Sequence, residues 1–309
     1  TWSDMLLDPA TEPVPVDPEY FVAYENLRGN FAGLLNPQLL EAKRQFPLSD
    51  GVDQENWLSE IFAIDPSPTY WQLDHAGHLA YENRSFAHAA EWFERSINMS
   101  GGRYKLKHVI PRIKKLAQSY QQIGRYQRAA YYWNQYISFI QKGSRAREIN
   151  VDDYRESANA NYYAENFGEA ATYWRIYLKL LKTTGQEISA EDYKSAAMAF
   201  YDAHDFKSAG NYYKRYFEVL ATQDKEPAWQ FLHDIAVSFY NLNNFKEASG
   251  YCGRLIQAKL KSNVKPSSDD YKYAAILYAA SNRFKSAAYF GEQYLKSLGP
   301  EDDRPEPPF

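Results

Sequence analysis

Cysteine is nearly absent from this sequence, because Cys252 is the only one in 309 residues. A single thiol excludes an internal disulfide and any metal site built from several cysteines. Long apolar runs are also missing, since none approaches the length of about 18 residues that a membrane-spanning helix needs. The net charge of −4 is small, so the whole molecule gives no electrostatic reason to expect nucleic acid or an anionic membrane surface as a partner.

Catalytic motifs are missing as well. The sequence has no glycine-rich phosphate loop, no nucleophile elbow and no HExxH motif. Its paired carboxylates, such as Asp152 and Asp153, stand where helices are expected to begin, and there they satisfy free backbone amides. His75 and His78 are spaced to reach one metal ion, but the sequence places no third ligand beside them. We therefore predict a protein without catalytic activity, cofactor or bound metal.

What the sequence does contain is a repeat. One aromatic residue, which we call the turn ring, recurs at intervals of 39 to 41 positions: Phe86, Tyr126, Phe167, Phe206, Phe245 and Phe284. An alanine stands three residues after each turn ring: Ala89, Ala129, Ala170, Ala209, Ala248 and Ala287. Nine residues before each turn ring stands a small residue: Gly77, Ala117, Ala158, Ala197, Ala236 and Ala275. Small residues in two consecutive helices let the backbones approach closely, so each copy predicts a helix–turn–helix hairpin.

Large residues complete the repeat. Seven residues after the turn ring, four of the six copies carry Phe93, Trp133, Trp174 and Tyr213, and the exceptions are Cys252 and Gly291. Cys252 therefore occupies a packing position, and we expect it to be an unreactive core thiol.

This pattern resembles the tetratricopeptide repeat (TPR) family over about residues 69–299. The resemblance implies an all-α, right-handed superhelical solenoid of about six hairpins with a binding function, and it does not name the ligand. The usual period is about 34 residues. Since the spacing within each hairpin is unchanged here, we expect the extra residues in a longer second helix and the loop after it.

Four segments are expected along the chain. Residues 1–16 form a flexible acidic tail, 17–66 an N-terminal helical cap, 67–298 the six repeats, and 299–309 a flexible acidic, proline-rich tail. Within the cap, a helix is expected over about Gln54–Ile64. We interpret the start at Thr1 as a trimmed end, which leaves a lost signal peptide, anchor or neighbouring domain open. The compartment, cytoplasmic or bacterial periplasmic, stays open with it.

In the family, the first helices line the concave wall, so the resemblance implies that equal positions of these helices stack into rows. Twelve residues before the turn ring the row is Asp74, Lys114, Arg155, Lys194, His233 and Lys272, and five before it the row is Tyr81, Gln121, Tyr162, Tyr201, Tyr240 and Ala279. Cations pair with carboxylates, and tyrosines offer contact area and a hydroxyl. The predicted partner-binding residues are Lys114, Arg155, Asn159, Lys194, His233, Lys272, Tyr162, Tyr201 and Tyr240. The alternative is that these lysines are ordinary solvent-exposed residues of the helix faces and bind no partner.

From these rows we predict a non-catalytic scaffold that binds a segment of a partner protein, acidic in character, in the concave groove. Arg155 and Asn159, flanked by Lys114 and Lys194, resemble part of the clamp with which some TPR proteins hold a chaperone's C-terminal carboxylates. Gln118 and Met198 leave that clamp incomplete.

Two alternatives stay open. One is a bacterial envelope module that handles an anionic polysaccharide or assembles an export or secretion complex. The other is a part of a larger complex that uses its convex face or its ends. Salt dependence of binding and competition between an acidic peptide and a polyanionic sugar separate these possibilities.

Overall fold

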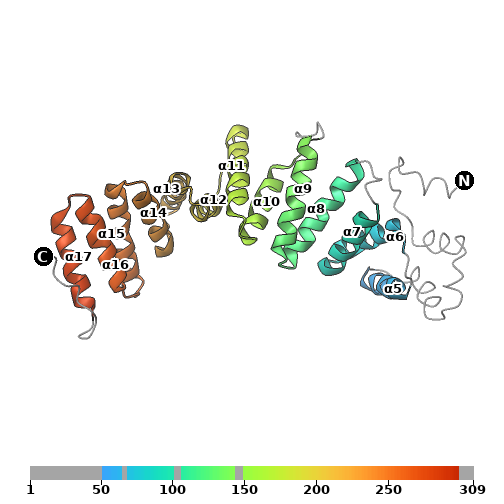
Figure 1. The fold of residues 1–309 in the computed structure, drawn as a ribbon, viewed down its shortest axis with the longest axis horizontal. Helices are drawn as coiled ribbons and strands as arrows, with labels where there is room; N and C mark the ends of the chain where they lie inside the picture. The colour runs from blue at the N-terminus through green and yellow to red at the C-terminus, as the bar shows by residue number, and fades with distance from the viewer. Residues whose placement is uncertain (1–50, 65–67, 101–105, 143–148, 299–309) are drawn as a thin grey trace, which may run out of the picture. The chain divides into compact units, whose positions relative to one another are not determined.

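The computed structural model describes residues 51–64, 68–100, 106–142 and 149–298. This part of the chain is entirely helical, with no strand, and its helices are drawn in Figure 1. In chain order they are α5 (Gly51–Ile64), α6 (Tyr70–Glu82), α7 (Phe86–Ser100), α8 (Leu106–Gln122), α9 (Tyr126–Lys142), α10 (Val151–Tyr163), α11 (Phe167–Thr184), α12 (Ala190–Asp202), α13 (Phe206–Thr222), α14 (Trp229–Asn241), α15 (Phe245–Lys261), α16 (Ser268–Ala280) and α17 (Phe284–Ser297). The expected all-α class is confirmed. The right-handed superhelix stays a prediction.

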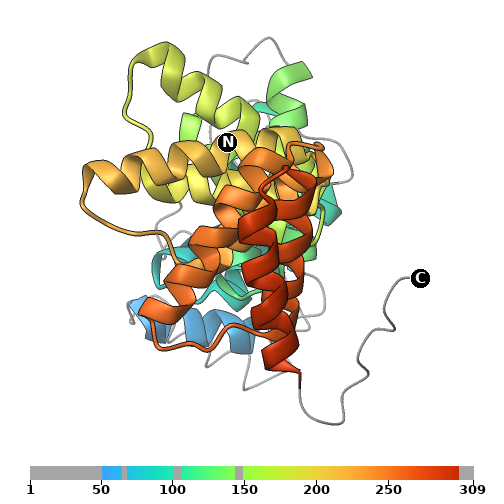
Figure 2. The ribbon, with the colours of Figure 1, turned by 90° about the vertical axis from the view of Figure 1, so that its left-hand side faces the viewer.

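The chain divides into two compact units, Thr1–Glu165 and Asn166–Phe309, which we describe separately. In the first unit, α6 packs against α7 and α8 against α9, while α7 contacts α8 and α9 contacts α10. In the second unit, α12 packs against α13, α14 against α15 and α16 against α17, and successive hairpins touch through α13 with α14 and α15 with α16. The last hairpin, α16 and α17, lies foremost in Figure 2.

The helix α5 begins at Gly51, three residues earlier than expected. Its Phe62 ring meets Trp92 of α7 edge to face, with centroids 5.6 Å apart. Glu55 of α5 accepts a hydrogen bond from Asn83 in the turn after α6. Since α5 contacts the first hairpin through both groups, it covers part of that hairpin. The remaining residues of the predicted cap, 17–50, and both predicted tails lie outside the described residues.

The turn between the two helices of a hairpin has one geometry throughout. Every second helix begins at the turn ring, and the residue two before it has a positive φ, between 55° and 72°. In the first turn, the Ser85 amide donates to the Ala80 carbonyl at 2.8 Å, and the equivalent bonds are made by the amides of Arg125, Asp205, Asn244 and Arg283. This αL residue ends the first helix, and glycine supplies it only at Gly124. The uniform turn explains why spacing within each hairpin is constant.

In the first hairpin, a small residue of the first helix lies against a large residue of the second helix. Gly77 lies against the Phe93 ring so closely that an added Cβ atom would stand 2.8 Å from Phe93 Cδ1. Trp133, Trp174 and Tyr213, at the position equivalent to Phe93, are fully buried. Cys252, at the same position, is buried too, and burial raises the pKa of its thiol to about 12, as expected of an unreactive core thiol.

The extra residues of the long period lie where we expected them. Most first helices have 13 residues. The second helices α9, α11, α13 and α15 have 17 or 18 residues. The structure is therefore that of TPR-like hairpins with lengthened second helices.

Gly77→Ala tests this register. The added methyl group must displace the Phe93 ring, so we expect the free energy of unfolding to fall by about 1–3 kcal/mol. The matched control is Gly250→Ala in α15, where an added Cβ atom meets nothing within 4 Å and the helix gains up to about 1 kcal/mol. Urea unfolding followed by circular dichroism measures both. Equal stability of Gly77→Ala and wild type would show that the register is wrong.

Candidate functional site

The nine predicted binding residues all lie on first helices, as the register requires. The first unit holds Lys114 on α8 and Arg155, Asn159 and Tyr162 on α10. The second unit holds Lys194 and Tyr201 on α12, His233 and Tyr240 on α14, and Lys272 on α16. Each set is therefore considered within its own unit.

The cations of the first unit are engaged in the fold. Lys114 Nζ lies 2.8 Å from Asp153 Oδ1, and the Asp153 side chain is only 5% exposed. The Tyr136 hydroxyl donates to the other oxygen of Asp153 at 2.7 Å. Asp153 thus joins three helices in addition to standing in the first turn of α10, which was the only role that we expected for it. Arg155 pairs with Asp152 at 3.4 Å on its own helix.

The first helices of the first two hairpins, α6 and α8, also contact one another through their side chains. Asp74 accepts two hydrogen bonds from Arg112, one of them 2.7 Å from Nη2 to Oδ2, and both side chains are buried. The Lys115 ammonium lies 2.7 Å from His78 Nδ1 and 5.0 Å from the centre of the Tyr81 ring. Burial lowers the pKa of His78, which favours the neutral imidazole. These groups connect the α6–α7 and α8–α9 hairpins, and a partner would have to compete with these contacts.

The second unit presents a different surface. Lys194 pairs with Glu191, and Lys272 is exposed with its ammonium 6.0 Å from the centre of the Tyr294 ring. The His233 side chain is about half exposed (49%), with Nδ1 3.3 Å from Asp234 Oδ1. These three side chains stand at the same position of α12, α14 and α16.

Tyrosines and apolar residues lie beside these cations. Tyr240 is 42% exposed and meets Tyr273 of α16 with ring centroids 5.8 Å apart. Tyr201 is half-buried, and burial together with nearby Asp234 raises its pKa, so it keeps its proton. Eight residues before the turn ring, the same three helices carry Met198, Val237 and Ile276, of which Ile276 is 51% exposed. The first helices of the second unit therefore display a row of two lysines and a histidine, an apolar row beside it, and a tyrosine on each of α12 and α14.

Contacts between successive hairpins follow a rule that we did not predict. The residue eight after one turn ring meets the residue six before the next turn ring. In the second unit, Arg175 lies over Phe200 at 4.9 Å and Lys214 over Phe239 at 4.7 Å, measured to the ring centroids. In the first unit, the amides of Asn134 and Asn161 bond each other at 2.9 and 3.2 Å. The signal was in the sequence, at fixed offsets, but only the structure shows that the two positions touch.

The first of these contacts is a carboxylate held by two tyrosines. Tyr120 and Tyr132 each donate to Glu94 at 2.6 Å, and Arg128 lies 2.5 Å from it. Burial alone would raise the pKa of Glu94, but these hydrogen bonds and the Arg128 charge hold it below its ordinary value. Burial and the bond to Glu94 also raise the pKa of Tyr120 to about 12. Because Glu94, its two tyrosines and Arg128 bond to one another, we interpret the cluster as a structural contact between hairpins.

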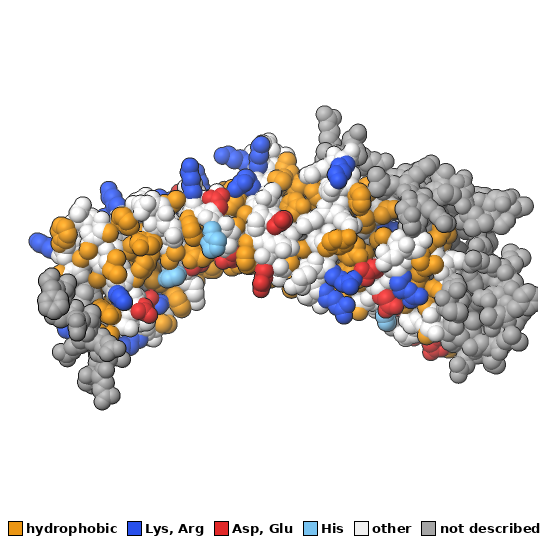
Figure 3. Space-filling model, viewed as in Figure 1, with side chains coloured by type: hydrophobic (Ala, Val, Ile, Leu, Met, Phe, Trp, Pro, Cys, Tyr) orange, Lys and Arg blue, Asp and Glu red, His pale blue; other side chains and the backbone are white. Residues whose placement is uncertain are grey.

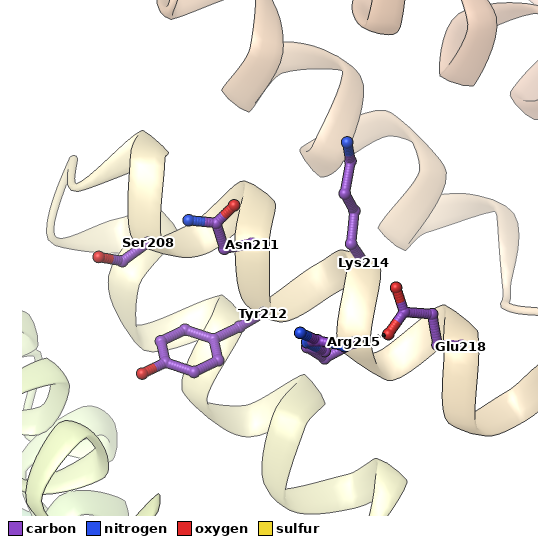
Figure 4. Close-up of a pocket in the computed structure, with 6 residues that line it drawn as sticks. All are labelled: Ser208, Asn211, Tyr212, Lys214, Arg215 and Glu218. Carbon is purple, nitrogen blue, oxygen red and sulfur yellow. Dashed lines mark hydrogen bonds and ion pairs between the residues drawn. The ribbon is translucent and has the colours of Figure 1, made fainter. Parts of the chain in front are cut away.

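A hollow on the second unit is lined by one helix, and its charged side chains are paired. All six residues that line it come from the single helix α13: Ser208, Asn211, Tyr212, Lys214, Arg215 and Glu218 (Figure 4). Arg215 pairs with Glu218 at 2.8 Å, and Lys214 pairs with Glu247 at 3.3 Å.

Within the described ranges, no three His, Cys, Asp or Glu side chains come close enough to hold a metal ion. None of the described helices is long and apolar enough to cross a membrane.

Comparison with known proteins finds partial likenesses among solved structures. No family model matches the chain, and no curated protein matches it. Among solved structures, BtubC from P. vanneervenii is 18% identical, with a TM-score of 0.41 over 74% of this chain and 98% of that one. MamA of AMB-1 is 13% identical, with a TM-score of 0.45 over 64% and 94%. YrrB, described as a TPR protein with an unusual peptide-binding site, is 13% identical, with a TM-score of 0.44 over 69% and 95%.

These scores describe partial likenesses, and the assignment of fold rests on the hairpins themselves. Six equal turns, small residues packed against large rings and lengthened second helices define a TPR-like helical repeat protein.

Glu94→Gln tests the tyrosine-held carboxylate. Because the pKa of Glu94 is depressed in the folded state, its stabilising effect is present above the unfolded value of about 4.3 and is lost as the pH falls through the folded value. Wild type should exceed the variant in unfolding free energy at neutral pH, and the difference should shrink below about pH 4.3. Urea titrations at several pH values measure this, and a difference independent of pH would contradict the assignment.

Proposed function

We propose that this chain is a non-catalytic scaffold that binds a segment of a partner protein on the first-helix face of its second unit. The observation that supports this most directly is the set of parallel rows on α12, α14 and α16. Exposed Tyr240 and Ile276 supply apolar contact area that the unit itself leaves uncovered. Solvent-facing aromatic and apolar groups beside cations are typical of protein-binding surfaces.

The basic side chains of these helices indicate that the partner segment is acidic. Lys194, His233 and Lys272 stand one per hairpin along one side of the apolar row. Acidic groups of the partner would pair with them, while its apolar side chains cover Met198, Val237 and Ile276. Such charge pairs at the edge of an interface set orientation and association rate more than affinity.

In the first unit, Arg155, Asn159 and Tyr162 of α10 form the corresponding surface. Arg155 is 38% exposed as a side chain, and Asn159 and Tyr162 are half-buried. Lys114 contributes less, because its ammonium already neutralises the buried Asp153. We assign the main contact to the second unit for this reason.

A pair of charge reversals tests the proposal. Lys194→Glu together with Lys272→Glu should weaken partner binding at least tenfold, because both cations would then repel an acidic segment. Lys272 is exposed, so its reversal should change the free energy of unfolding by about 0.5 kcal/mol or less. Lys194 is 22% exposed and pairs with Glu191, so the unfolding of the double variant is measured beside its binding. Binding is measured by affinity capture with the whole chain from the source lysate, followed by quantitative mass spectrometry.

Photo-crosslinking locates the contact. Benzoylphenylalanine at Tyr240 should crosslink the partner, whereas the same group at Tyr289 on the second helix α17, which is 56% exposed, should not. Crosslinking from position 289 alone would overturn the proposal in favour of the second-helix face. Displacement of the partner by an anionic polysaccharide, but not by an acidic peptide, would replace it with the polysaccharide-handling function.

A further inference from the structure

The last helix that the structure describes, α17, has one face that no described helix covers. In α9, α11, α13 and α15, the residues four and eleven after the turn ring are buried, and the next first helix packs against each of these helices. The equivalent residues of α17 are exposed: Ala288, and Leu295 at 58%. None of the residues of α17 is buried, and no described helix stands in front of it in Figure 2.

We call Phe284, Ala288, Glu292 and Leu295 the end face. Their spacing of four, four and three residues places them on one side of the helix. The turn ring Phe284 is 66% exposed, whereas the turn rings of the earlier hairpins are all half-buried. Hydrophobic side chains are visible on the surface of α16 and α17, at the left-hand end of Figure 3. Terminal units of repeat proteins usually have a polar outer face, and an apolar one indicates an interaction site.

The earlier hairpins show what kind of element covers such a face. In the second unit, an added Cβ atom on Gly210, near the start of α13, would stand 3.3 Å from the Phe239 ring, near the end of α14. Farther along α13, Tyr216 meets Phe231, near the start of α14, with ring centroids 5.6 Å apart. The two contacts follow in opposite order along the two helices, so the covering helix runs antiparallel. A small residue four after the turn ring thus receives a large side chain of the covering helix.

The helix α7 combines the same groups as the end face. Ala90 and Glu94 stand four and eight residues after its turn ring, as Ala288 and Glu292 do in α17. The other second helices have no carboxylate at the later of these positions. On α7 this pair receives α8, whose Tyr120 hydroxyl donates to Glu94 at 2.6 Å. The contact of α7 with α8 therefore indicates the kind of helix that fits α17.

Glu292 can accept a similar hydrogen bond. It pairs with Lys296 one turn along α17 at 2.7 Å, and the two side chains are 62% and 63% exposed. An exposed ion pair of this kind contributes little to stability, and a carboxylate has further lone pairs to share. In α7, Glu94 likewise bonds Arg128 and Tyr120 at the same time. The pair with Lys296 is therefore compatible with a hydroxyl donor from a partner.

The sequence that follows α17 does not suit this covering helix. Residues 299–309 include Pro300, Pro305, Pro307 and Pro308. Proline inside a helix removes a backbone hydrogen bond and clashes with the preceding turn. We therefore expect the covering helix to come from another protein.

We propose that the end face of α17 binds an amphipathic helix of a partner protein, antiparallel to α17. A tyrosine of this helix lies over Ala288 and donates its hydroxyl to Glu292, and apolar side chains cover Leu295. This surface is separate from the first-helix face of α12, α14 and α16, and the proposal does not depend on that face.

The probe is a fluorescent synthetic peptide with the sequence of α8, Leu106–Gln122, because this helix carries the required tyrosine. Fluorescence anisotropy with the whole chain measures its binding. The test variant is Leu295→Glu. The matched control is Tyr289→Glu on the same helix, which is equally exposed (56%) but five residues after the turn ring, where Tyr131 of α9 is exposed too. Both substitutions replace exposed side chains, so the Tm should stay close to that of wild type.

Wild type should bind the peptide saturably. Leu295→Glu should lose about tenfold or more in affinity because it places a charge in the apolar contact, and Tyr289→Glu should lose less than about threefold. A double-mutant cycle tests the hydroxyl. The Tyr120→Phe peptide should bind wild type about tenfold more weakly than the parent peptide, and this difference should disappear in Glu292→Ala, which lacks the accepting carboxylate.

Absence of peptide binding would overturn the proposal. An equal loss of affinity in Leu295→Glu and Tyr289→Glu would also overturn it, because that result indicates nonspecific apolar attraction. A dimer of the whole chain that Leu295→Glu dissociates, measured by analytical ultracentrifugation, would show that a second copy covers the end face instead. A photo-crosslink from position 288 to residues 299–309 of the same molecule would show that the chain covers this face itself.

Discussion

The close approach of two helices within each hairpin is the constraint on which the rest depends. It requires a small residue in the first helix where a large ring arrives from the second, and Gly77 against Phe93 shows how little space is left. That contact fixes the rotation of both helices about their axes. Once the rotation is fixed, every other position has a defined face, so equal positions of successive hairpins form rows. The surface that we propose for partner binding is a consequence of this packing.

The first helices of the two units make different contacts. In the first unit, charged groups pair with one another across hairpins, since Asp74 is bound by Arg112 and Asp153 by Lys114. A buried carboxylate must keep such a partner, because removing one side costs about 3–5 kcal/mol. In the second unit, contacts between hairpins combine aromatic rings under Arg175 and Lys214 with a nearly buried ion pair, Lys259 to Asp270 at 2.7 Å. On its first helices Tyr240 and Ile276 stay exposed, and we propose them for partner binding.

The sequence was sufficient to predict the hairpins, their register and the longer second helices, because these follow from periodic size and local turn signals. It did not predict that Lys114 would be paired. The partner, Asp153, stands in the next hairpin, and spacing alone does not show which side chains meet across hairpins. The residues with positive φ were also missed, because Arg84 and Glu165 give no glycine signal.

One distance tests most directly whether a single register runs through the second unit. Spin labels at Lys207→Cys and Lys285→Cys would occupy equal positions two hairpins apart, and the buried Cys252 would stay unlabelled. Because one register fixes both labelled positions on consecutively packed helices, the account predicts one narrow distance distribution. A broad or two-peaked distribution would show that equal positions do not align and would contradict the account.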